Sequence, residues 1–350
     1  MIDWNDRWKE FLIEQGAVVG DDGVRHFAEA DPHAQSRLAA ADDILADLSH
    51  LGLIRADGPD AAAFLQDQLS NDIRRVDAGH GQLSAYCLPN GRMLALVRVF
   101  LRAGAYYLQL PATIQPATLA RLKLFVLRAK VTLASADREF VRLGLSGPIA
   151  PRLLRAAGLT PPEHTDEAAE QDGITLLRLP GPHPRFEIIA GLEAGQRLWT
   201  TLAGQTAAVG ASAWSWLDIA AGVPMLQPGA IGEFIPQMVN LDLLDGVSFQ
   251  KGCYPGQEIV ARVHHLGRVK QRLFLGHVAA GARPAVGVTI RAAGSDQGVG
   301  RVVDAQPAPA GGYDLAAVID LDRIETALYL DGIPGPRLTL QKPPFSTGNF

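Results

Sequence analysis

The sequence predicts an α+β protein of two or three domains that ends in a small all-β domain. Three observations lead to this expectation. The chain has 350 residues, more than a single hydrophobic core normally organises. Over the first two thirds, stretches with the apolar spacing of helices alternate with stretches of period-2 spacing. After Lys270, short β-branched runs are separated by glycine and proline, which is typical of a small barrel or sandwich.

The composition is that of a turn-rich globular protein, with 47% hydrophobic and 20% charged residues. A formal charge of -5 and a pI near 6.0 argue against a general basic field for nucleic acid, and leave local clusters open. Residues 1–15 match neither a signal nor a transit peptide, so we expect a cytoplasmic protein. The uncharged stretch 198–217 contains polar residues and glycines, which favours a buried helix, a turn and the next element over a membrane span.

The first elements are a strand, a helix and three antiparallel strands. Residues 51–55 are expected to form a strand, and a helix begins near Pro59, because proline suits the first helical position. Residues 81–111 then alternate with period 2 in three runs. The runs are separated by Asn90-Gly91, a strong hairpin signal, and by a second turn at 103–104.

The next elements follow the order of a ferredoxin-like unit. A helix over 116–129 leads to a strand in "EFVRLGLSGP" and a short helix that ends near Gly158. Strands at 174–179 and 186–190, a helix at 192–203 and a further strand complete the order strand, helix, strand, strand, helix, strand. The acidic run between Pro161 and Asp172 is expected to be an exposed loop.

The final segment supplies six short runs for an all-β domain: "RLFLGHV", "GVTIRAA", "GVGRVVDA", "YDLAAVID", "TALYL" and "RLTLQ". Residues 341–350 are expected to form a flexible tail.

The motif "KGCYPGQE", residues 251–258, holds one of only two cysteines, Cys253. The glycines on either side, Gly252 and Gly256, permit backbone conformations closed to other residues, and Tyr254 before Pro255 is pushed towards an extended shape. A helix is expected from Gln257, with its apolar face at Ile259, Val263 and Leu266. The thiol would then lie just before a helix N-terminus, where the dipole favours a thiolate.

Positive charge gathers around this motif. Lys251 is adjacent to the thiol's glycine, and no acidic residue lies between Glu258 and Arg272, while Arg262, His264, His265, Arg268 and Lys270 fall in that interval. One interpretation is a reactive, partly exposed cysteine. The other is a packed cysteine in a tight turn, beside a basic helix face that meets solvent. The residues by themselves leave both open.

The stretch "NLDLLDGVSFQKGCYPGQEIVARVHHLGRVKQRL" resembles the signature of the YgfZ family of folate-binding proteins, which assist iron–sulfur cluster proteins and affect tRNA modification. The resemblance extends through "GPDAAAFLQDQLSNDI", "IAAGVPM" and "GEFIPQMVNLDLL", and covers about residues 40–335. That family shares a superfamily with the glycine-cleavage T-protein, an aminomethyltransferase that uses tetrahydrofolate.

This resemblance implies a three-domain cloverleaf. The expected parts are an N-terminal α+β folate-binding domain at 1–138, a ferredoxin-like domain at 139–217 and a C-terminal β-barrel at 266–340, with segment 218–265 packed back on the first domain. The ring of domains implies a central channel for tetrahydrofolate or a derivative, with or without a polyglutamate tail. No stably bound metal is expected.

Two departures from the T-protein bear on activity. Where the resemblance places two adjacent aspartates after the hairpin turn, this chain has Ala95 and Leu96, and amine transfer to folate needs a group that positions and deprotonates the nitrogen. Where T-proteins carry an arginine in "R-x-E-A-G", this chain has Asp218 in "DIAAG". An aminomethyltransferase is therefore disfavoured, and whether the chain is an enzyme stays open.

The resemblance also suggests folate-contacting residues. Glu187 falls where the superfamily has a pterin-facing glutamate, and an exposed strand-end carboxylate is the alternative. Four further residues are expected either to contact the ligand or to cap turns and helix ends. They are Asn71, Asp72, Asn240 and Asp242. Tyr254, Gln257, Glu258 and Arg262 are expected to shape the Cys253 loop against the channel.

The favoured function is that of a folate-binding accessory protein for iron–sulfur cluster proteins, with Cys253 as the functional thiol and Lys251 lowering its pKa. The thiol could form a mixed disulfide, touch a cluster in transfer or accept a one-carbon unit. The alternatives are a folate-dependent one-carbon transferase or demethylase, and a tRNA-binding factor that uses Arg262–Arg272. The expected partners are folate, iron–sulfur client or assembly proteins and a weak tRNA contact, with no membrane. Cys87 is expected either in the core or facing the channel.

Overall fold

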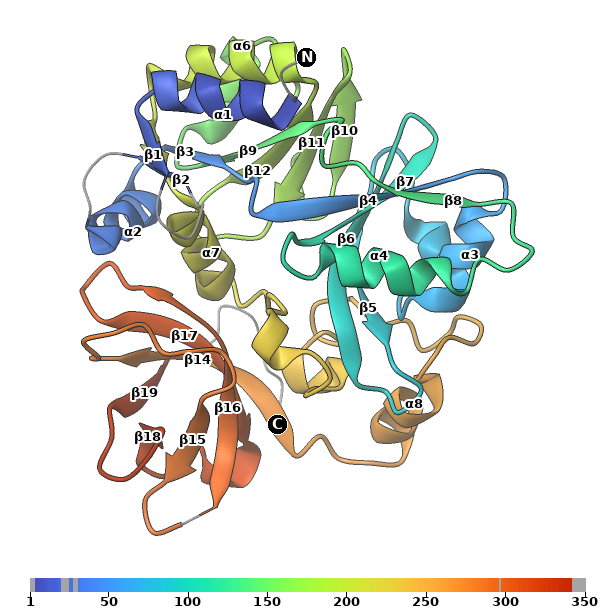
Figure 1. The fold of residues 1–350 in the computed structure, drawn as a ribbon. Helices are drawn as coiled ribbons and strands as arrows, with labels where there is room; N and C mark the ends of the chain where they lie inside the picture. The colour runs from blue at the N-terminus through green and yellow to red at the C-terminus, as the bar shows by residue number, and fades with distance from the viewer. Residues whose placement is uncertain (1–3, 20–24, 28–30, 296, 342–350) are drawn as a thin grey trace.

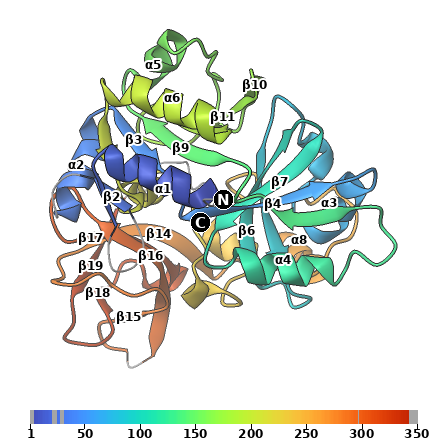
Figure 2. The ribbon, with the colours of Figure 1, turned by 45° about the horizontal axis from the view of Figure 1, so that its top comes forward.

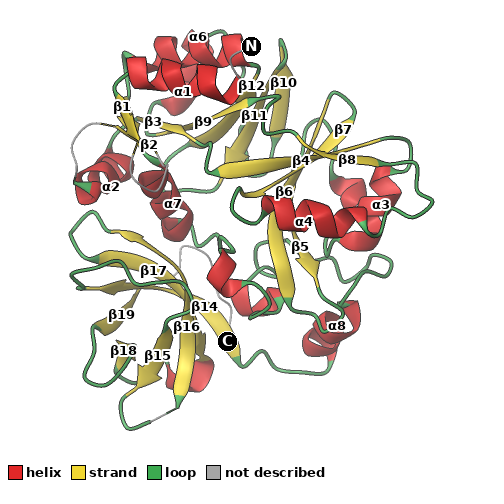
Figure 3. Ribbon diagram, in the orientation of Figure 1, coloured by secondary structure: helices red, strands yellow, loops and turns green. Residues whose placement is uncertain are grey.

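The computed structural model describes residues 4–19, 25–27, 31–295 and 297–341. The α+β class is confirmed: two sheets with helices and a closed β-barrel form three lobes around the connecting segment 211–265 (Figure 1). Coloured by secondary structure, the strands gather into these three groups, with helices on the two sheets (Figure 3).

The first lobe contains the predicted antiparallel hairpins. Its five-stranded sheet has the order β5-β6-β7-β4-β8. The helix predicted over 116–129 ends early, at Lys123. Turns with i to i+3 hydrogen bonds follow it, and the chain then returns so that β8 pairs with β4. The elements are β4 (Leu51–Asp57), α3 (Ala61–Gln68), η1 (Ile73–Arg75), β5 (Gln82–Cys87), β6 (Met93–Arg102), β7 (Ala105–Pro111), α4 (Gln115–Lys123) and β8 (Thr132–Ser135).

The second lobe has the predicted ferredoxin-like order with two unpredicted strands. One is β3, inside the sheet; the other is β10 at its edge, which pairs with β11, so the expectation of an exposed loop over 161–172 is wrong for residues 168–171. Its sheet runs β10-β11-β12-β9-β3-β13, so β3 lies between β9 and β13. The expected strand at 174–179 and helix at 192–203 have the predicted bounds. The elements are β3 (Ile44–Asp47), β9 (Val141–Ser146), α5 (Ala150–Ala156), β10 (Ala168–Gln171), β11 (Ile174–Leu179), β12 (Arg185–Ala190), α6 (Leu192–Ala203) and β13 (Ala207–Val209).

The N-terminal segment belongs to this second lobe, whereas the sequence placed residues 1–138 in the first. Trp8 packs edge-on against Trp199 with ring centroids 6.0 Å apart, and α1 lies beside α6 over the sheet (Figure 2). All four residues of β3 are buried, so the sheet gains a strand that is covered on both faces. The segment comprises α1 (Trp4–Glu14), β1 (Ala17–Val19), β2 (Arg25–Phe27), α2 (Pro32–Ala41) and β3.

The third lobe is a closed barrel in the order β14-β17-β16-β15-β18-β19, which confirms the all-β C-terminal prediction. Its strands are β14 (Gln271–Val278), β15 (Thr289–Ala292), β16 (Gly298–Pro307), β17 (Tyr313–Asp320), β18 (Leu328–Leu330) and β19 (Arg337–Gln341), with η4 (Leu321–Arg323) after β17. The tail expected at 341–350 lies outside the described residues beyond Gln341.

The connecting segment joins the first lobe to the barrel. It contains α7 (Ala211–Ala220), η2 (Pro228–Ala230), η3 (Pro236–Val239) and α8 (Gln257–His265). Its apolar side chains, among them Val239 and Leu241, share one core with Leu83 and Leu96 of the first sheet and with Leu273 of the barrel. The stretch 198–217 is divided among α6, β13 and α7, and none of the described helices is long and apolar enough to cross a membrane.

Candidate functional site

A small cavity of about 40 Å³ lies where the first sheet meets the second sheet and α7. Its polar lining comes from both sheets: Arg98 and Gln109 from β6 and β7, Glu187 from β12, and Asp218 from α7. Leu96, Trp214 and Met225 belong to its apolar lining. Ligand sites commonly form at such domain interfaces, with few polar groups among apolar walls.

Glu187 is fully buried in the middle of β12, so the alternative of an exposed strand-end carboxylate is wrong. Gln109 Nε2 donates a hydrogen bond to its Oε1 atom, and the buried Oε2 atom has no partner among the described residues. Burial raises the pKa of Glu187 to about 7, against the lowering effect of Arg98, Arg142 and Gln109. The carboxyl therefore titrates near neutral pH and has one oxygen available to a ligand.

The register of β6 separates the two residues that stand in place of the transferase aspartates. Leu96 lines the cavity, whereas Ala95 packs on the opposite face of the sheet with Tyr86 and Val97. Successive strand residues point to opposite faces, so only position 96 could present a carboxylate to the cavity. The cavity has an apolar wall there.

Asp218, where the T-protein pattern has an arginine, is paired with a buried cation. Arg185 Nη1 donates to Asp218 Oδ1 at 2.8 Å, and Arg185 Nη2 donates to the Trp214 carbonyl at 3.0 Å. The Arg185 guanidinium also lies 4.0 Å from the centroid of the Trp214 ring. Charges of both signs are thus buried and paired beside the cavity, and sequence reasoning had identified only Asp218.

Cys253 is exposed, and the loop that carries it rests on the hairpin turn between β5 and β6. A Cβ atom on Gly256 would lie 2.5 Å from the Leu88 carbonyl oxygen and 2.7 Å from the Gly91 Cα atom. Gly256 has φ of 83° and precedes α8, which begins at Gln257 as predicted. The apolar face of α8 is centred on the fully buried Val260, whereas Leu266, expected on that face, is 87% exposed because the helix ends at His265.

Replacing Gly256 with alanine is expected to destabilise the protein by about 2–4 kcal/mol, because left-handed backbone strain adds to the cost of overpacking. Gly252→Ala is the matched control: no atom lies within 4 Å of its Cβ position, and Gly252 is absent from the residues with positive φ, contrary to the sequence expectation. Thermal and urea unfolding of both variants measure this difference. Equal unfolding midpoints for the two variants would contradict the close packing of the Cys253 loop against the hairpin turn.

Lys251 was expected to lower the pKa of Cys253, but its ammonium group is bound elsewhere. Its Nζ atom donates to the carbonyl oxygens of Gln66, Leu69 and Asn71, at 2.5, 2.5 and 3.0 Å, and so caps the end of α3. Burial lowers the pKa of Lys251 to about 8. Lys251 therefore anchors the Cys253 loop to the first lobe.

Tyr254 and Cys87 lie beneath this loop. Tyr254 is buried, and burial is the main cause that raises its pKa, followed by the nearby Cys87. Cys87 is buried in the core shared with the connecting segment, and burial raises its pKa to about 12. The core interpretation of Cys87 is the one that the structure supports, since Cys87 is absent from the cavity lining.

The four other residues expected to contact folate instead form hydrogen bonds or ion pairs within the protein. Asn71 Nδ2 donates to the Leu83 and Asp245 carbonyls, and Asp72 caps η1 and pairs with Arg74. Asn240 Nδ2 donates to the Leu273 carbonyl.

Asp242 forms a two-point ion pair with Arg272, at 2.6 and 3.0 Å. Like Asn240, it fastens the connecting segment to β14. Neither of these two residues, and neither Asn71 nor Asp72, lines the cavity.

The remaining motif residues lie on or near α8. Gln257 Nε2 reaches the Lys251 carbonyl at 3.4 Å, and Glu258 pairs with Arg262 on the exposed face. None of residues 251–262 lines the cavity, and Figure 1 shows α8 at the outer end of the β5–β6 hairpin, away from β12. The thiol and the cavity are therefore two separate sites.

His264 stacks on Phe249 with ring centroids 3.7 Å apart, and His265 meets both rings edge-on. Among the residues that the structure describes, no group of three or more His, Cys, Asp or Glu side chains is arranged to hold a metal ion.

Sequence reasoning missed Arg98, Gln109 and Arg185. Each is a polar residue in a strand whose neighbours are apolar, and such residues in buried strands are the signal that could have identified them.

Comparisons with known proteins agree with the motif resemblance. Residues 25–169 match the model of the GCVT N-terminal domain. The chain is 32% identical over 248 residues to the tRNA-modifying protein YgfZ of Klebsiella pneumoniae (strain 342), which covers 71% of this chain and 75% of that protein. It is 30% identical to the tRNA-modifying protein YgfZ of Edwardsiella ictaluri (strain 93-146), over 84% of this chain and 90% of that protein.

Among solved structures, the glycine cleavage system aminomethyltransferase T from Bartonella henselae aligns with a TM-score of 0.76 and 19% identity, covering 96% of each chain. This likeness establishes a common fold.

Proposed function

Because the chain belongs to the YgfZ family of tRNA-modifying proteins, we propose that it is a folate-binding accessory protein for the assembly, maintenance or repair of iron–sulfur proteins. It acts in the cytoplasm and supports tRNA thiomethylation indirectly, through those client proteins. The observation that supports folate binding is the buried carboxyl of Glu187, a residue that lines the interface cavity and whose Oε2 atom has no partner among the described residues.

The residues of the cavity suit a tetrahydropterin. The ring's N–H groups need a carboxylate or amide oxygen, and Glu187 offers one while Gln109 holds its other oxygen. Ligand pockets typically measure about 300–1,000 Å³, so the cavity of about 40 Å³ must widen on binding. Met225, a flexible side chain in its wall, is suited to moving aside. When bound, tetrahydrofolate supplies a carrier for one-carbon units.

The wall at Leu96 argues against a transferase. A side chain that deprotonates an attacking amine must lie within hydrogen-bond reach of it, and leucine offers no such group. Glu187, the carboxyl that is present, is committed to Gln109 at one oxygen and to the proposed ring contact at the other. The protein therefore binds folate without carrying out aminomethyl transfer.

Contact with client proteins is assigned to Cys253. Its side chain is exposed on a loop that Lys251 and Gly256 seat on the first lobe, so the sulfur is presented at a fixed place. Cys87 cannot substitute, because its buried thiol has a pKa raised to about 12 and stays protonated.

A complementation experiment tests this function. In cells that lack the protein, Cys253→Ala is expected to restore less than about a tenth of the wild-type activity of iron–sulfur dehydratases and of tRNA thiomethylation, because the exposed thiol is the nucleophile or ligand that no other described residue replaces. Cys87→Ala, the same chemical change in the core, is the control and should restore both, provided that its melting curve shows a folded protein. Full rescue by Cys253→Ala would remove the thiol from the function.

A further inference from the structure

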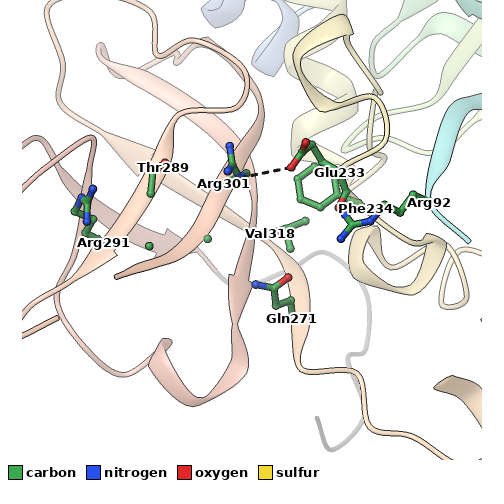
Figure 4. Close-up of a pocket in the computed structure, with 10 residues that line it drawn as sticks. Arg92, Glu233, Phe234, Gln271, Thr289, Arg291, Arg301 and Val318 are labelled. Carbon is green, nitrogen blue, oxygen red and sulfur yellow. Dashed lines mark hydrogen bonds and ion pairs between the residues drawn. The ribbon is translucent and has the colours of Figure 1, made fainter. Parts of the chain in front are cut away.

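A second and larger cleft, of about 510 Å³, lies between the barrel and the segment that follows α7 (Figure 4). Its walls include Arg291 of β15, Arg301 of β16 and Arg92 at the start of the β5–β6 return, together with Glu233 and Gln271. We call it the arginine cleft. Three guanidinium groups from separate parts of the chain at one cleft are unusual in a protein with a net charge of -5.

Arginines outnumber acidic residues among the described residues that line the arginine cleft. Of the lining residues that the structure describes, Glu233 is the one acidic residue, and its Oε2 atom lies 3.7 Å from Arg301 Nε. The side chains of this pair are 50% and 43% exposed, so the pair is loose and adds little stability. Arg92 Nη1 donates to the carbonyl oxygens of Gly232 and Glu233, which fixes its guanidinium at the rim.

The positive surface continues out of the cleft along the chain. Gln271, in the cleft wall, directly follows the exposed stretch that holds Arg262, His264, His265, Arg268 and Lys270. Arg262 is paired with Glu258, so the positive charge of this stretch comes from Arg268 and Lys270. No acidic residue occurs between Glu258 and Asp296. The residues from Arg262 to Gln271 span at most roughly 20 Å, since four lie in α8 and the others form a short connection to β14.

We propose that the arginine cleft and the stretch 262–270 together bind the phosphate backbone of an RNA strand. A small anion would fill the cleft alone, whereas a charged track that continues for at most roughly 20 Å matches a chain of phosphates. The choice of RNA among polyanions rests on the proposed function, in which the protein supports tRNA thiomethylation through its client proteins; a direct contact with the RNA goes beyond that function. The net negative charge of the whole protein makes this binding weak and strongly dependent on salt.

Two substitutions with opposite expected effects test the proposal. Binding of a fluorescein-labelled, unmodified tRNA transcript is followed by anisotropy between about 50 and 200 mM salt. Arg301→Gln is expected to weaken binding about three- to tenfold and to reduce the salt slope by roughly one unit, as expected for one lost phosphate contact. Glu233→Gln is expected to strengthen binding, because the carboxylate that competes for Arg301 is removed.

Arg37→Gln is the matched control, since Arg37 is 54% exposed, pairs with Asp31 at 2.9 Å and lies on α2, outside the cleft. The Arg37→Gln variant should bind the RNA with the affinity of the wild type.

Equal losses of RNA affinity in Arg37→Gln and Arg301→Gln would overturn the proposal, as would weaker RNA binding by Glu233→Gln. Complete displacement of the RNA by tri-γ-glutamate or inorganic pyrophosphate at equal molar concentration would also overturn it, in favour of a small anion. Tetrahydrofolate affinity, measured on the same variants, should not change, so failure of the RNA proposal is distinguishable from failure of folate binding.

Discussion

Arg185→Met is expected to destabilise the protein by about 3–5 kcal/mol, the cost of removing one partner of a buried ion pair. The change leaves Asp218 buried without its cation, and an uncompensated buried charge costs far more than the pair itself contributes. It also removes the guanidinium from the face of the Trp214 ring and from the Trp214 carbonyl. Urea and thermal unfolding measure the loss.

Two comparisons isolate the cause of this loss. The double variant Arg185→Met/Asp218→Leu replaces both charges with apolar side chains and should recover most of the stability. Arg178 also lies over an aromatic ring, 4.6 Å from the Phe186 centroid, but has no carboxylate partner among the residues that the structure describes, so Arg178→Gln should cost less than about 1 kcal/mol. If the double variant were less stable than Arg185→Met alone, the buried charge would not be the cause.

Glu187→Gln is expected to weaken tetrahydrofolate binding by about 10- to 100-fold, the value of a hydrogen bond to a charged acceptor. The pH dependence has a defined sign. Burial raises the pKa of Glu187 to about 7, so the carboxylate that accepts from the ring's N–H groups is the minor form below that pH and the major form above it. Wild-type affinity should therefore rise from pH 6 to pH 8, and the affinity of the glutamine variant should not follow that rise.

Local sequence signals predicted much of the fold. The strand Ile174–Leu179 and the helix Leu192–Ala203 have the expected bounds, because their periodicity is uninterrupted. The position of β3 could not be predicted, because its partners β9 and β13 come much later in the chain and nothing in its four residues specifies them. The same limit explains why the N-terminal helix was placed with the wrong sheet.

In the candidate sites, too, local sequence signals indicated some residues, whereas contacts between distant parts of the chain determine how they are placed. The resemblance indicated Glu187, but its burial depends on how the second sheet packs against the first, and Gln109 and Arg98 come from that other sheet. Lys251 is adjacent to the thiol in sequence, yet its ammonium reaches carbonyls at the end of α3, some 180 residues earlier in the chain. For Cys253 the sequence left an exposed and a packed cysteine open, and the structure shows the exposed one, in the turn that the glycines and proline around it indicate.

The separation of the two sites also corrects one expectation. The sequence placed Gln257, Glu258 and Arg262 against the folate channel, whereas they lie on α8 beyond the hairpin turn. In the proposed function, folate binding at Glu187 and client contact at Cys253 are therefore joined through the β5–β6 hairpin, which carries Leu96 at one end and supports the Cys253 loop at the other.

Calorimetric titration with tetrahydrofolate at pH 8 tests whether Glu187 forms the folate site. The wild type and Glu193→Gln, which changes an exposed carboxylate on α6, are expected to bind one equivalent with equal affinity, while Glu187→Gln binds about 10- to 100-fold more weakly. Absence of heat with the wild type at high micromolar concentrations, or equal affinity of all three proteins, would contradict a folate site at Glu187.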